Sequence, residues 1–259
     1  MSFFKPCCFA LLCAAMLTPA CSTTPQPAVE SPVASATACD GAVFQGKCVH
    51  KGDIVTFGKY PQATETPEPI EWIVLEIAPD ANNIMSGKML LLSKYVLDTQ
   101  RFTVAFRGEN IIWESSSLRQ WLNNDFLHSA FHQSERPWIL LSHLDIDIST
   151  DYIYISKGDI ATDDYIFVLS LDDVSSSPDL EGKFVNEREA KATSYAIKKG
   201  VYTETNQDTC ENAQCLASWW VRSGGYGLCA FSVSFDGGID CINAKNNKIG
   251  VRPAMWVKY

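Results

Sequence analysis

The sequence predicts an α+β domain over residues 51–259, with β-strands near both ends and helices in the middle. Three observations lead to this prediction. Apolar and polar residues alternate near both ends, a stretch of helical periodicity lies between them, and Gly and Pro punctuate the boundaries. We expect a mixed or antiparallel sheet that is closed by the first and last strands, with helices packed on it and long loops.

Residues 1–20 have the features of a secretory signal peptide. Lys5 is the only charge before an apolar run, Pro6–Leu17, and the small residue Ala20 precedes Cys21. Ala before Cys is similar to the bacterial lipobox, in which the cysteine is acylated, as with palmitate, and becomes the mature N-terminus. We expect Cys21 to hold the protein on a membrane through lipid alone, with an ordinary secreted protein cut after Ala20 as the alternative. No later stretch is long and apolar enough to span a bilayer.

Residues 21–50 are expected to connect the lipid to the domain. Positions 22–38 are mostly Ser, Thr, Pro and Ala, which predicts a disordered tether. Cys39–Cys48 then predicts a small disulfide-closed turn, because no second cysteine pair follows at zinc spacing. Ser22, the second mature residue, carries no Asp-type retention signal, so we expect the outer membrane or the cell surface.

The cysteines predict disulfide bonds. Of the ten in the chain, Cys7, Cys8 and Cys13 leave with the signal, and Cys21 takes the lipid. An even number remains, as is typical of exported proteins. Short loops favour the pairs Cys39–Cys48, Cys210–Cys215 and Cys229–Cys241. The main rival is a nested arrangement, 210–241 with 215–229.

The first half of the domain is predicted to contribute three strands, at residues 53–60, 70–77 and 89–92. Pro61 ends the first strand, and Trp72 lies inside the second. We expect a polar turn over 79–88 and an irregular loop over 97–112.

The main helix is predicted within residues 113–131. Ser115–Ser117 precede an apolar period and can cap the first helical turn. The apolar stripe consists of Leu118, Trp121, Leu122 and Phe126. Asn123–Asp125 is interpreted as the helix end, followed by a short second apolar turn. Because this stripe is rich in aromatic residues, we expect it to pack on the sheet and to have no catalytic role.

The second half alternates short helices and strands. We expect short helical segments at 135–141 and 171–177, a helix over 187–200 that ends at Gly200, and strands at 165–170, 218–222, 228–235 and 250–257. Paired glycines at 224–225 and 237–238 mark turns between the last strands.

Several motifs, in order along residues 51–259, resemble a bacterial extracytoplasmic domain family of unknown function. They are FGKYPQ at 57–62, IEW at 70–72, LLSKYVLD at 91–98, SLRQWLN at 117–123, WWVRS at 219–223 and GVRPA at 250–254. The ending is also similar to the C-type-lectin-like fold of formylglycine-generating enzymes and of several ligand-binding domains. This resemblance implies that the last strands pair with the first, and that an Arg near the C-terminus packs on aromatic residues.

Five residues are candidates for ligand binding: Trp219, Trp220, Arg222, Asp236 and Arg252. An Arg in these strands can stack on Trp219, Trp220 or Trp256, or pair with Glu71 or Asp236. The functional hypothesis is a sugar or peptide pocket that is floored by Trp and rimmed by Asn, Asp and Arg. The structural alternative is that both arginines only support the core.

The sequence predicts no catalytic residue, metal or cofactor. His128 and His132 are four residues apart but lack the HExxH pattern, with His143 following, and Asp145, Asp147 and Asp151 lack the Gly and Glu of an EF-hand. Serines 115–117 and 175–177 have no G-x-S-x-G context. Cys229 has no neighbouring His or Lys to lower its thiol pKa, which favours a disulfide over a copper-binding pair.

A formal net charge of −9 without a basic patch argues against nucleic acid as a partner. The sequence therefore predicts a cell-surface lipoprotein that presents a non-catalytic ligand-binding or adhesion domain to a glycan or peptide. One alternative is a formylglycine-generating oxidoreductase that uses a cysteine pair, and another is a structural envelope protein.

Overall fold

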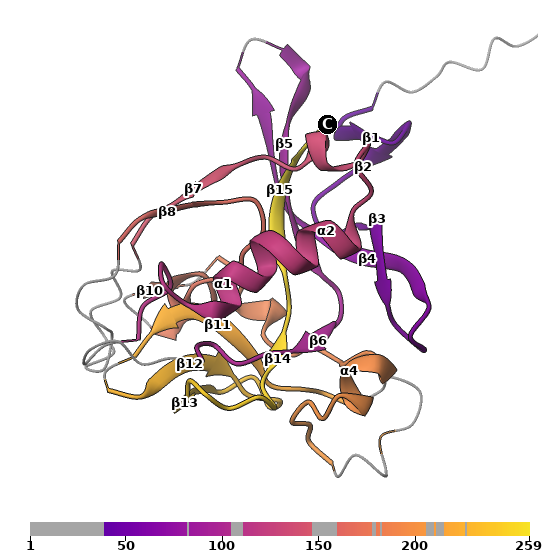
Figure 1. The fold of residues 1–259 in the computed structure, drawn as a ribbon. Helices are drawn as coiled ribbons and strands as arrows, with labels where there is room; N and C mark the ends of the chain where they lie inside the picture. Colours follow the sequence, from indigo (N-terminus) through magenta and orange to yellow (C-terminus); the bar gives the residue numbers. More distant parts are fainter. Residues whose placement is uncertain are drawn as a thin grey trace, which may run out of the picture. The chain divides into compact units, whose positions relative to one another are not determined.

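Two β-sheets hold most of the regular structure (Figure 1). The computed structural model describes residues 39–81, 83–104, 111–146, 160–177, 180–181, 183–205, 210, 215–225 and 227–259, all within one compact unit, Cys39–Tyr259. The signal peptide, Cys21 and the tether lie outside the described residues, as do Asp147 and Asp151. None of the described helices is long and apolar enough to cross a membrane.

The first sheet has four antiparallel strands in the order β15-β5-β4-β3. Its strands are β3 (Ile54–Pro61), β4 (Pro67–Asp80), β5 (Asn83–Ser93) and β15 (Ala254–Lys258). Strands β4 and β5 form a long hairpin through the segment predicted as a polar turn. Trp72 is fully buried on β4, and its Nε1 donates to the carbonyl of Phe57, 2.7 Å away.

The prediction that the first and last strands are neighbours is wrong. They share this sheet but lie at its opposite edges. The last strand, β15, pairs instead with β5, where Met255 lies opposite Leu91 and both side chains are fully buried. On its other side, β15 forms single bridges with Ile139 and Phe167. The apolar residues of β15 are therefore covered without β3.

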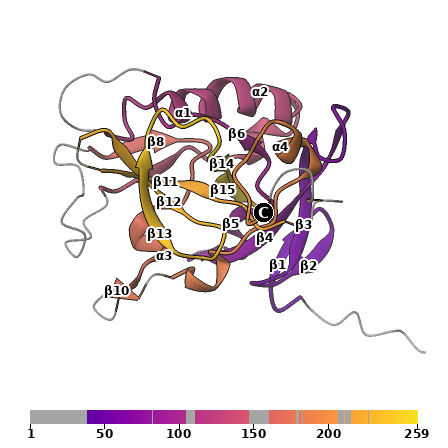
Figure 2. The ribbon, with the colours of Figure 1, turned by 90° about the horizontal axis from the view of Figure 1, so that it is seen from below.

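The second sheet has five strands in the order β13-β12-β11-β14-β6. They are β6 (Asp98–Thr99), β11 (Trp219–Gly224), β12 (Cys229–Val233), β13 (Ile239–Asn243) and β14 (Gly250–Val251). Strands β11 and β14 are parallel and the other pairs antiparallel, so this sheet is mixed. The Trp-rich strand β11 is thus central to a separate sheet. Seen from below, the two sheets lie on opposite sides of the compact unit, and the main helix runs along one side of both (Figure 2).

The main helix runs without a break through α1 (Ser117–Trp121), the π-helix η1 (Leu122–Phe126) and α2 (Leu127–Ala130). Ser116 caps it as predicted, since its hydroxyl accepts from the Arg119 amide, 3.1 Å away. The predicted end at Asn123–Asp125 is wrong, because Asn123 and Asn124 donate to carbonyls one turn back, those of Arg119 and Gln120. The Asn123 side chain also bonds to the backbone of Tyr165 and Ile166, and the wider π turn carries the chain on to Ala130.

The apolar stripe is buried as predicted, except at one residue. Leu118, Leu122 and Phe126 are fully buried, and Phe126 packs on Tyr60 of β3 and on Phe131. Trp121 is only partly buried, because it lies at the edge of the stripe against the ring of Phe126.

The remaining described elements are short. They are β1 (Ala42–Phe44), β2 (Lys47–Val49), η2 (Arg136–Trp138), β7 (Ser142–Leu144), β8 (Thr162–Asp164), α3 (Leu171–Val174), β9 (Ser176–Ser177), β10 (Leu180–Glu181), η3 (Val185–Glu187) and α4 (Ser194–Lys198). The described strands and the helices between them form an α+β fold, as the sequence predicts.

Two predicted elements differ from the structure. Residues 165–170 form no strand, although Phe167 bridges Ala254 of β15 and the Leu169 carbonyl accepts from the Arg222 amide of β11. The helix predicted over 187–200 is confined to α4, because Lys191 and Ala192 instead form bridges with Leu216 and Val96. Its predicted stop is correct, since Gly200 follows α4 with a φ of 97°.

The N-terminal hairpin β1-β2 is part of the compact unit. Ala42, Phe44 and Val49 are buried, and the Phe44 ring lies 5.9 Å from that of Phe57. The described unit therefore begins at Cys39, ahead of the boundary drawn from the sequence at residue 51.

The structure contains the disulfides Cys39–Cys48, Cys210–Cys215 and Cys229–Cys241. These are the pairs that the short loops favour, and they exclude the nested arrangement. The last one joins β12 to β13.

Replacing Phe126 by Ala should destabilise the protein by about 3–5 kcal/mol, because it removes a buried ring that the main helix packs against β3. The measurement is equilibrium unfolding in denaturant. Leu141→Ala, at a side chain that is 56% exposed, is the control and should cost less than about 1 kcal/mol. Equal effects of the two changes would contradict the burial of this stripe.

Candidate functional site

The two adjacent tryptophans of β11 are core residues on opposite faces of the sheet. Both are fully buried, and their indole N–H groups donate to backbone carbonyls, Trp219 to Arg188 and Trp220 to Gln100, each at 2.8 Å. The hypothesis of a pocket floored by these rings is therefore wrong, since neither is open to a ligand.

Arg252 is buried where the chain passes from β14 to β15. Its side chain is 1% exposed, and its guanidinium carbon lies 5.3 Å from the centre of the Trp219 ring. Nε donates to the carbonyl of Ser93 at 2.9 Å, and Nη1 donates to the carbonyl of Glu187. Burial lowers the pKa of Arg252 to about 10, and the Glu187 carboxylate, 3.9 Å away, opposes that shift. Arg252 thus supports the fold, in line with the structural alternative.

Arg222 is partly buried and reaches a different part of the chain. Its Nη1 donates to the carbonyl of Asp145 at 2.9 Å. Neither arginine pairs with the expected carboxylates, because Glu71 pairs with Lys94 at 2.9 Å and Asp236 bonds within its own turn.

Asp236 lines a cavity of the described structure. We call this cavity the Ser232 hollow. It measures about 400 Å³, within the range of about 300–1,000 Å³ usual for small-molecule sites. Its lining comprises Tyr202, Ser218, Ser232, Ser234, Phe235, Asp236, Asp240, Ile242, Asn246 and Ile249.

Strand pairing explains why these side chains converge. Ser232 of β12 lies directly opposite Asp240 of β13, so both point to the same face of the sheet. The neighbouring pair on that face is Ala230 with Ile242. The turn from β12 to β13 adds Ser234–Asp236, and the loop before β14 adds Asn246. One end of the five-stranded sheet is therefore lined with hydroxyls, carboxylates and an amide.

An aromatic wall completes the hollow. The rings of Tyr202 and Phe235 lie 6.2 Å apart at 35°, and Tyr202 is 54% exposed. Tyr202 is held by its backbone, since its amide donates to the carbonyl of Lys248 at 2.6 Å. Apolar ring faces and polar side chains thus line the same small cavity.

The Ser232 hydroxyl is a buried polar group without a partner. Its residue is 1% exposed, and the oxygen makes no hydrogen bond to any described residue. An unsatisfied buried hydroxyl costs about 1–3 kcal/mol. A hydroxyl-bearing ligand that enters this hollow could satisfy it.

The carboxylates make the hollow acidic. Asp236 accepts from the Ser234 hydroxyl at 2.5 Å and from the Gly238 amide at 3.0 Å. These hydrogen bonds, led by that of Ser234, lower the pKa of Asp236, so it is ionised at neutral pH. With Asp240 it provides acceptors for hydroxyl or ammonium donors.

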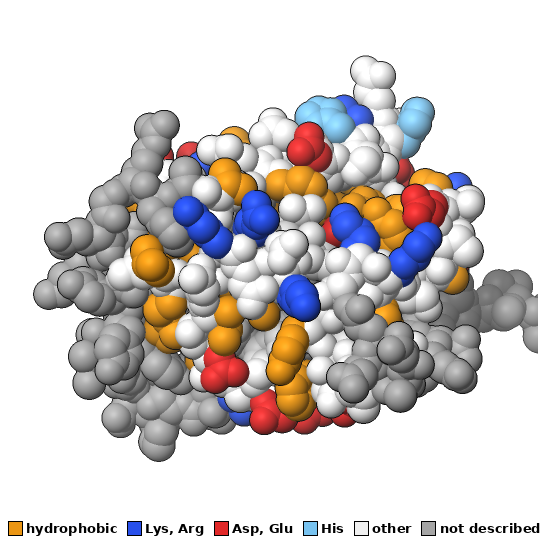
Figure 3. Space-filling view, turned by 60° about the horizontal axis from the view of Figure 1, so that its bottom comes forward, with side chains coloured by type: hydrophobic (Ala, Val, Ile, Leu, Met, Phe, Trp, Pro, Cys, Tyr) orange, Lys and Arg blue, Asp and Glu red, His pale blue; other side chains and the backbone are white. Residues whose placement is uncertain are grey.

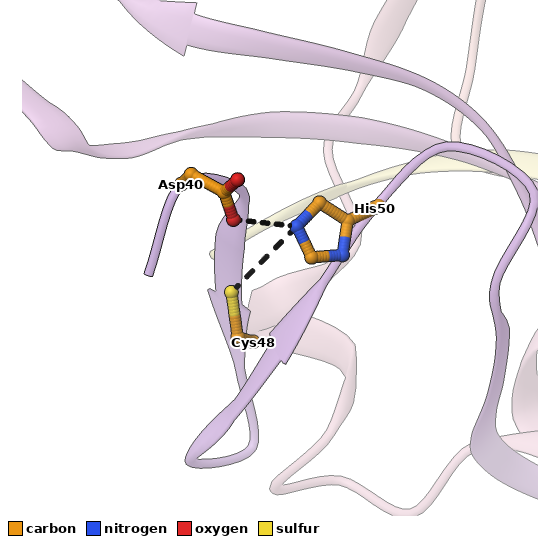
Figure 4. A group of neighbouring side chains, drawn as sticks. All are labelled: Asp40, Cys48 and His50. Carbon is orange, nitrogen blue, oxygen red and sulfur yellow. Dashed lines mark hydrogen bonds and ion pairs between the residues drawn. The ribbon is translucent and has the colours of Figure 1, made fainter. Parts of the chain in front are cut away.

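A second cluster lies at the start of the unit, where Asp40, Cys48 and His50 point toward one another (Figure 4). His50 Nε2 lies 2.8 Å from Asp40 Oδ1 and 4.0 Å from Cys48 Sγ. The hydrogen bond to Asp40 raises the pKa of His50 and lowers that of Asp40. Cys48 is bonded to Cys39, so its sulfur is no thiolate and this is a poor metal site.

The other described histidines bond to separate neighbours. His128 Nδ1 lies 2.6 Å from the Asn124 carbonyl, and His132 Nδ1 lies 2.8 Å from the Ser134 hydroxyl. His143 pairs across the β7-β8 hairpin with Asp163, at 2.9 Å, and also approaches Asp145. Among the residues that the structure describes, Asp40, Cys48 and His50 are the only group of three or more potential ligands.

Cys229 and Cys241, the pair that copper chemistry would require, form a disulfide against Gly225. A Cβ on Gly225 would lie 2.6 Å from both sulfurs, so the backbone packs directly on the bond. In this oxidised state neither sulfur is available as a thiolate.

Sequence comparison identifies the chain's relatives. The profile of the Domain of unknown function (DUF6273) family matches residues 86–259. The chain belongs to this family. DUF6273 thus covers β15, most of β5 and the whole five-stranded sheet, including all residues of the Ser232 hollow. No curated protein and no solved structure matches the chain.

Most residues of the hollow escaped the sequence analysis. Tyr202, Ser232, Asp240 and Asn246 come from four separate segments and carry no motif. The only local signals were polar residues within β12 and β13 on one side of an otherwise apolar pair of strands. Strand β13 itself was not predicted, so its pairing with β12 was unknown.

Proposed function

We propose that the protein is an exported lipoprotein whose domain binds a carbohydrate, without catalysis, in the Ser232 hollow. The observation that carries the proposal is the unpartnered, buried hydroxyl of Ser232, a residue that lines a cavity with an aromatic wall. Sugar rings combine apolar C–H faces with a surrounding set of hydroxyls. They therefore suit a site where aromatic rings and hydrogen-bonding groups lie together.

The charges of the lining favour a neutral sugar. Asp236 and Asp240 can accept from sugar hydroxyls, Asn246 can both donate and accept, and Ser232 can do either. Lys and Arg are absent from the described residues that line the hollow, so an anionic group would meet two carboxylates and no cation there. A peptide is the alternative ligand, and a purely structural role the alternative function.

The relation to the C-type-lectin-like fold is part of the same proposal. The packing of Arg252 on Trp219 supports it, because the resemblance implies an Arg near the C-terminus against aromatic residues. The separation of β3 from β15 departs from the expected pairing of the first and last strands. The rival oxidoreductase would require Cys229 and Cys241 to be reduced.

The anchor is the second element of the proposal. We propose that Cys21 is lipidated and that the domain stands at the outer membrane or cell surface. The three disulfides support an oxidising, exported environment.

Replacing Cys21 by Ser should leave an uncleaved precursor or release the protein from membranes, because the thiol that takes the lipid is lost. Membrane fractionation with immunodetection measures this, and Cys13→Ser, within the apolar run of the signal, is the control. A processed Cys21→Ser protein of mature length that stays with the membranes would refute the anchor.

The carbohydrate proposal is tested with glycan and peptide arrays, using the mature protein in detergent. We expect binding to neutral glycans. Tyr202→Ala and Asp240→Asn should each weaken that binding by about tenfold or more, because one removes an aromatic face and the other an acceptor. Tyr165→Ala, at another exposed tyrosine, is the matched control and should leave binding unchanged.

Two results would overturn the carbohydrate assignment. The first is binding to peptides alone, and the second is glycan binding that survives both Tyr202→Ala and Asp240→Asn. If the protein binds neither glycans nor peptides on the arrays, the result favours the structural alternative.

A further inference from the structure

A second hollow, of about 480 Å³, lies beside the first. It is lined by the end of β6 and the segment after it, by α1, by the residue after α4 and by the loop before β14. The residues are Thr99, Gln100, Arg101, Val104, Ser117, Trp121, Lys199 and Asn247. We call it the Arg101 hollow. Asn247 lines this hollow and the adjacent Asn246 lines the Ser232 hollow, so the loop before β14 forms a wall of both.

We propose that the Arg101 hollow binds the carboxylate of an acidic sugar, a uronic acid. The choice of a sugar rests on the proposed function, whereas the acidic group is argued from this hollow alone. Its polar side chains include Gln100, Arg101, Ser117, Lys199 and Asn247, and carboxylates are absent from its described lining. Both amides, the hydroxyl and the two cations can donate hydrogen bonds.

The positive charge available to a ligand comes from Arg101. Lys199 Nζ lies 2.6 Å from Oδ1 of Asp98, a side chain that is 1% exposed, so the charge of Lys199 is already balanced. Arg101 is exposed, and its guanidinium makes no hydrogen bond or ion pair with the rest of the described chain. A single uncompensated guanidinium suits a single carboxylate, to which its planar fork can donate two parallel hydrogen bonds.

Lys199 and Asn247 are held in place before a ligand arrives. Asp98 also accepts from the Tyr60 hydroxyl and the Thr99 amide, each at 2.5 Å, which fixes the carboxylate that holds Lys199. The Thr99 hydroxyl donates to the carbonyl of Asn247 and so fastens the loop. The Lys199 ammonium, held in this way, loses little freedom when a ligand binds.

Trp121 supplies the surface for a sugar ring. It is partly buried, with its ring 5.3 Å from that of Phe126, and it lines the hollow. The face of the molecule shown in Figure 3 carries Lys and Arg side chains with apolar side chains between them, and Asp and Glu side chains as well. The chain as a whole carries a net charge of −9, which favours a ligand with one carboxylate over a long polyanion.

The test compares a disaccharide of glucuronic acid and glucose with its methyl ester, by calorimetry at low salt. The ester keeps the ring and loses the charge. The protein should bind the acid at least about tenfold more tightly than the ester. Arg101→Gln should abolish this preference. Lys51→Gln, which removes an exposed charge from the turn before β3, should keep it.

Equal affinity for acid and ester, or a preference that survives Arg101→Gln, would overturn the inference. Displacement of the disaccharide by equimolar inorganic phosphate would also overturn it, because the hollow would then be a general anion site. The outcome is separable from that of the proposed function. If Tyr202→Ala and Asp240→Asn leave neutral-sugar binding unchanged while the acid preference still depends on Arg101, the Ser232 hollow fails and the Arg101 hollow stands.

Discussion

The contacts of the Arg252 guanidinium join the two sheets, and the arrangement of the rest of the domain depends on them. The chain leaves the five-stranded sheet at Val251 and enters the four-stranded sheet at Ala254. Between them, the side chain of Arg252 donates to the carbonyl of Ser93, at the end of β5, and lies over Trp219 of β11. A buried charge is tolerated only when its hydrogen bonds and its counter-charge are supplied, and here Glu187 and two carbonyls supply them.

This junction also determines where the hollows form. Because β14 pairs with β11 on one side and β6 on the other, the loop before β14 is drawn next to the segment that follows β6. Asn246 of that loop lines the Ser232 hollow, and the adjacent Asn247 lines the Arg101 hollow. Both proposed sites therefore depend on the short parallel contact between Trp219 and Gly250. Gly250 is required there, since a Cβ would lie 2.2 Å from Val96 and 2.8 Å from the Ser218 carbonyl.

Local patterns in the sequence were sufficient for the features that depend on nearby residues. The alternation at 53–60, the cap formed by Ser116 and the short-loop disulfides all follow from neighbours in the chain. The π-helical turn at Leu122–Phe126 did not, because Asn123 is held by distant groups, the carbonyl of Ile166 and the amide of Tyr165. Strand pairing also depends on residues far apart in the sequence, so local patterns do not show that β15 pairs with β5 rather than with β3.

The candidate site was predicted even less well, for the same reason. The sequence predicted ligand binding by Trp219, Trp220 and Arg252, because tryptophan and arginine often contact ligands. In the structure these three side chains are buried in the core. Asp236 reached the surface of a cavity because it lies in a turn. Tyr202 and Asn246, which line the same cavity, lie on two other loops and come close to Asp236 only when the chain folds. Single-sequence patterns carry no information on that convergence.

The most direct test of the account is the replacement of Arg252 by Met, followed by denaturant unfolding and amide hydrogen exchange. We expect a loss of about 3–5 kcal/mol, because the change leaves the carbonyls of Ser93 and Glu187 without their donor and removes the counter-charge of the partly exposed Glu187 carboxylate. Amides of β5 and β11 should lose protection together, since Arg252 contacts the end of one strand and a residue of the other. Arg222→Met, which removes the hydrogen bond from a partly buried side chain to the Asp145 carbonyl, should cost about 1 kcal/mol or less. A loss below about 1 kcal/mol for Arg252→Met, or weakened protection in only one sheet, would contradict its role as the tie between the sheets.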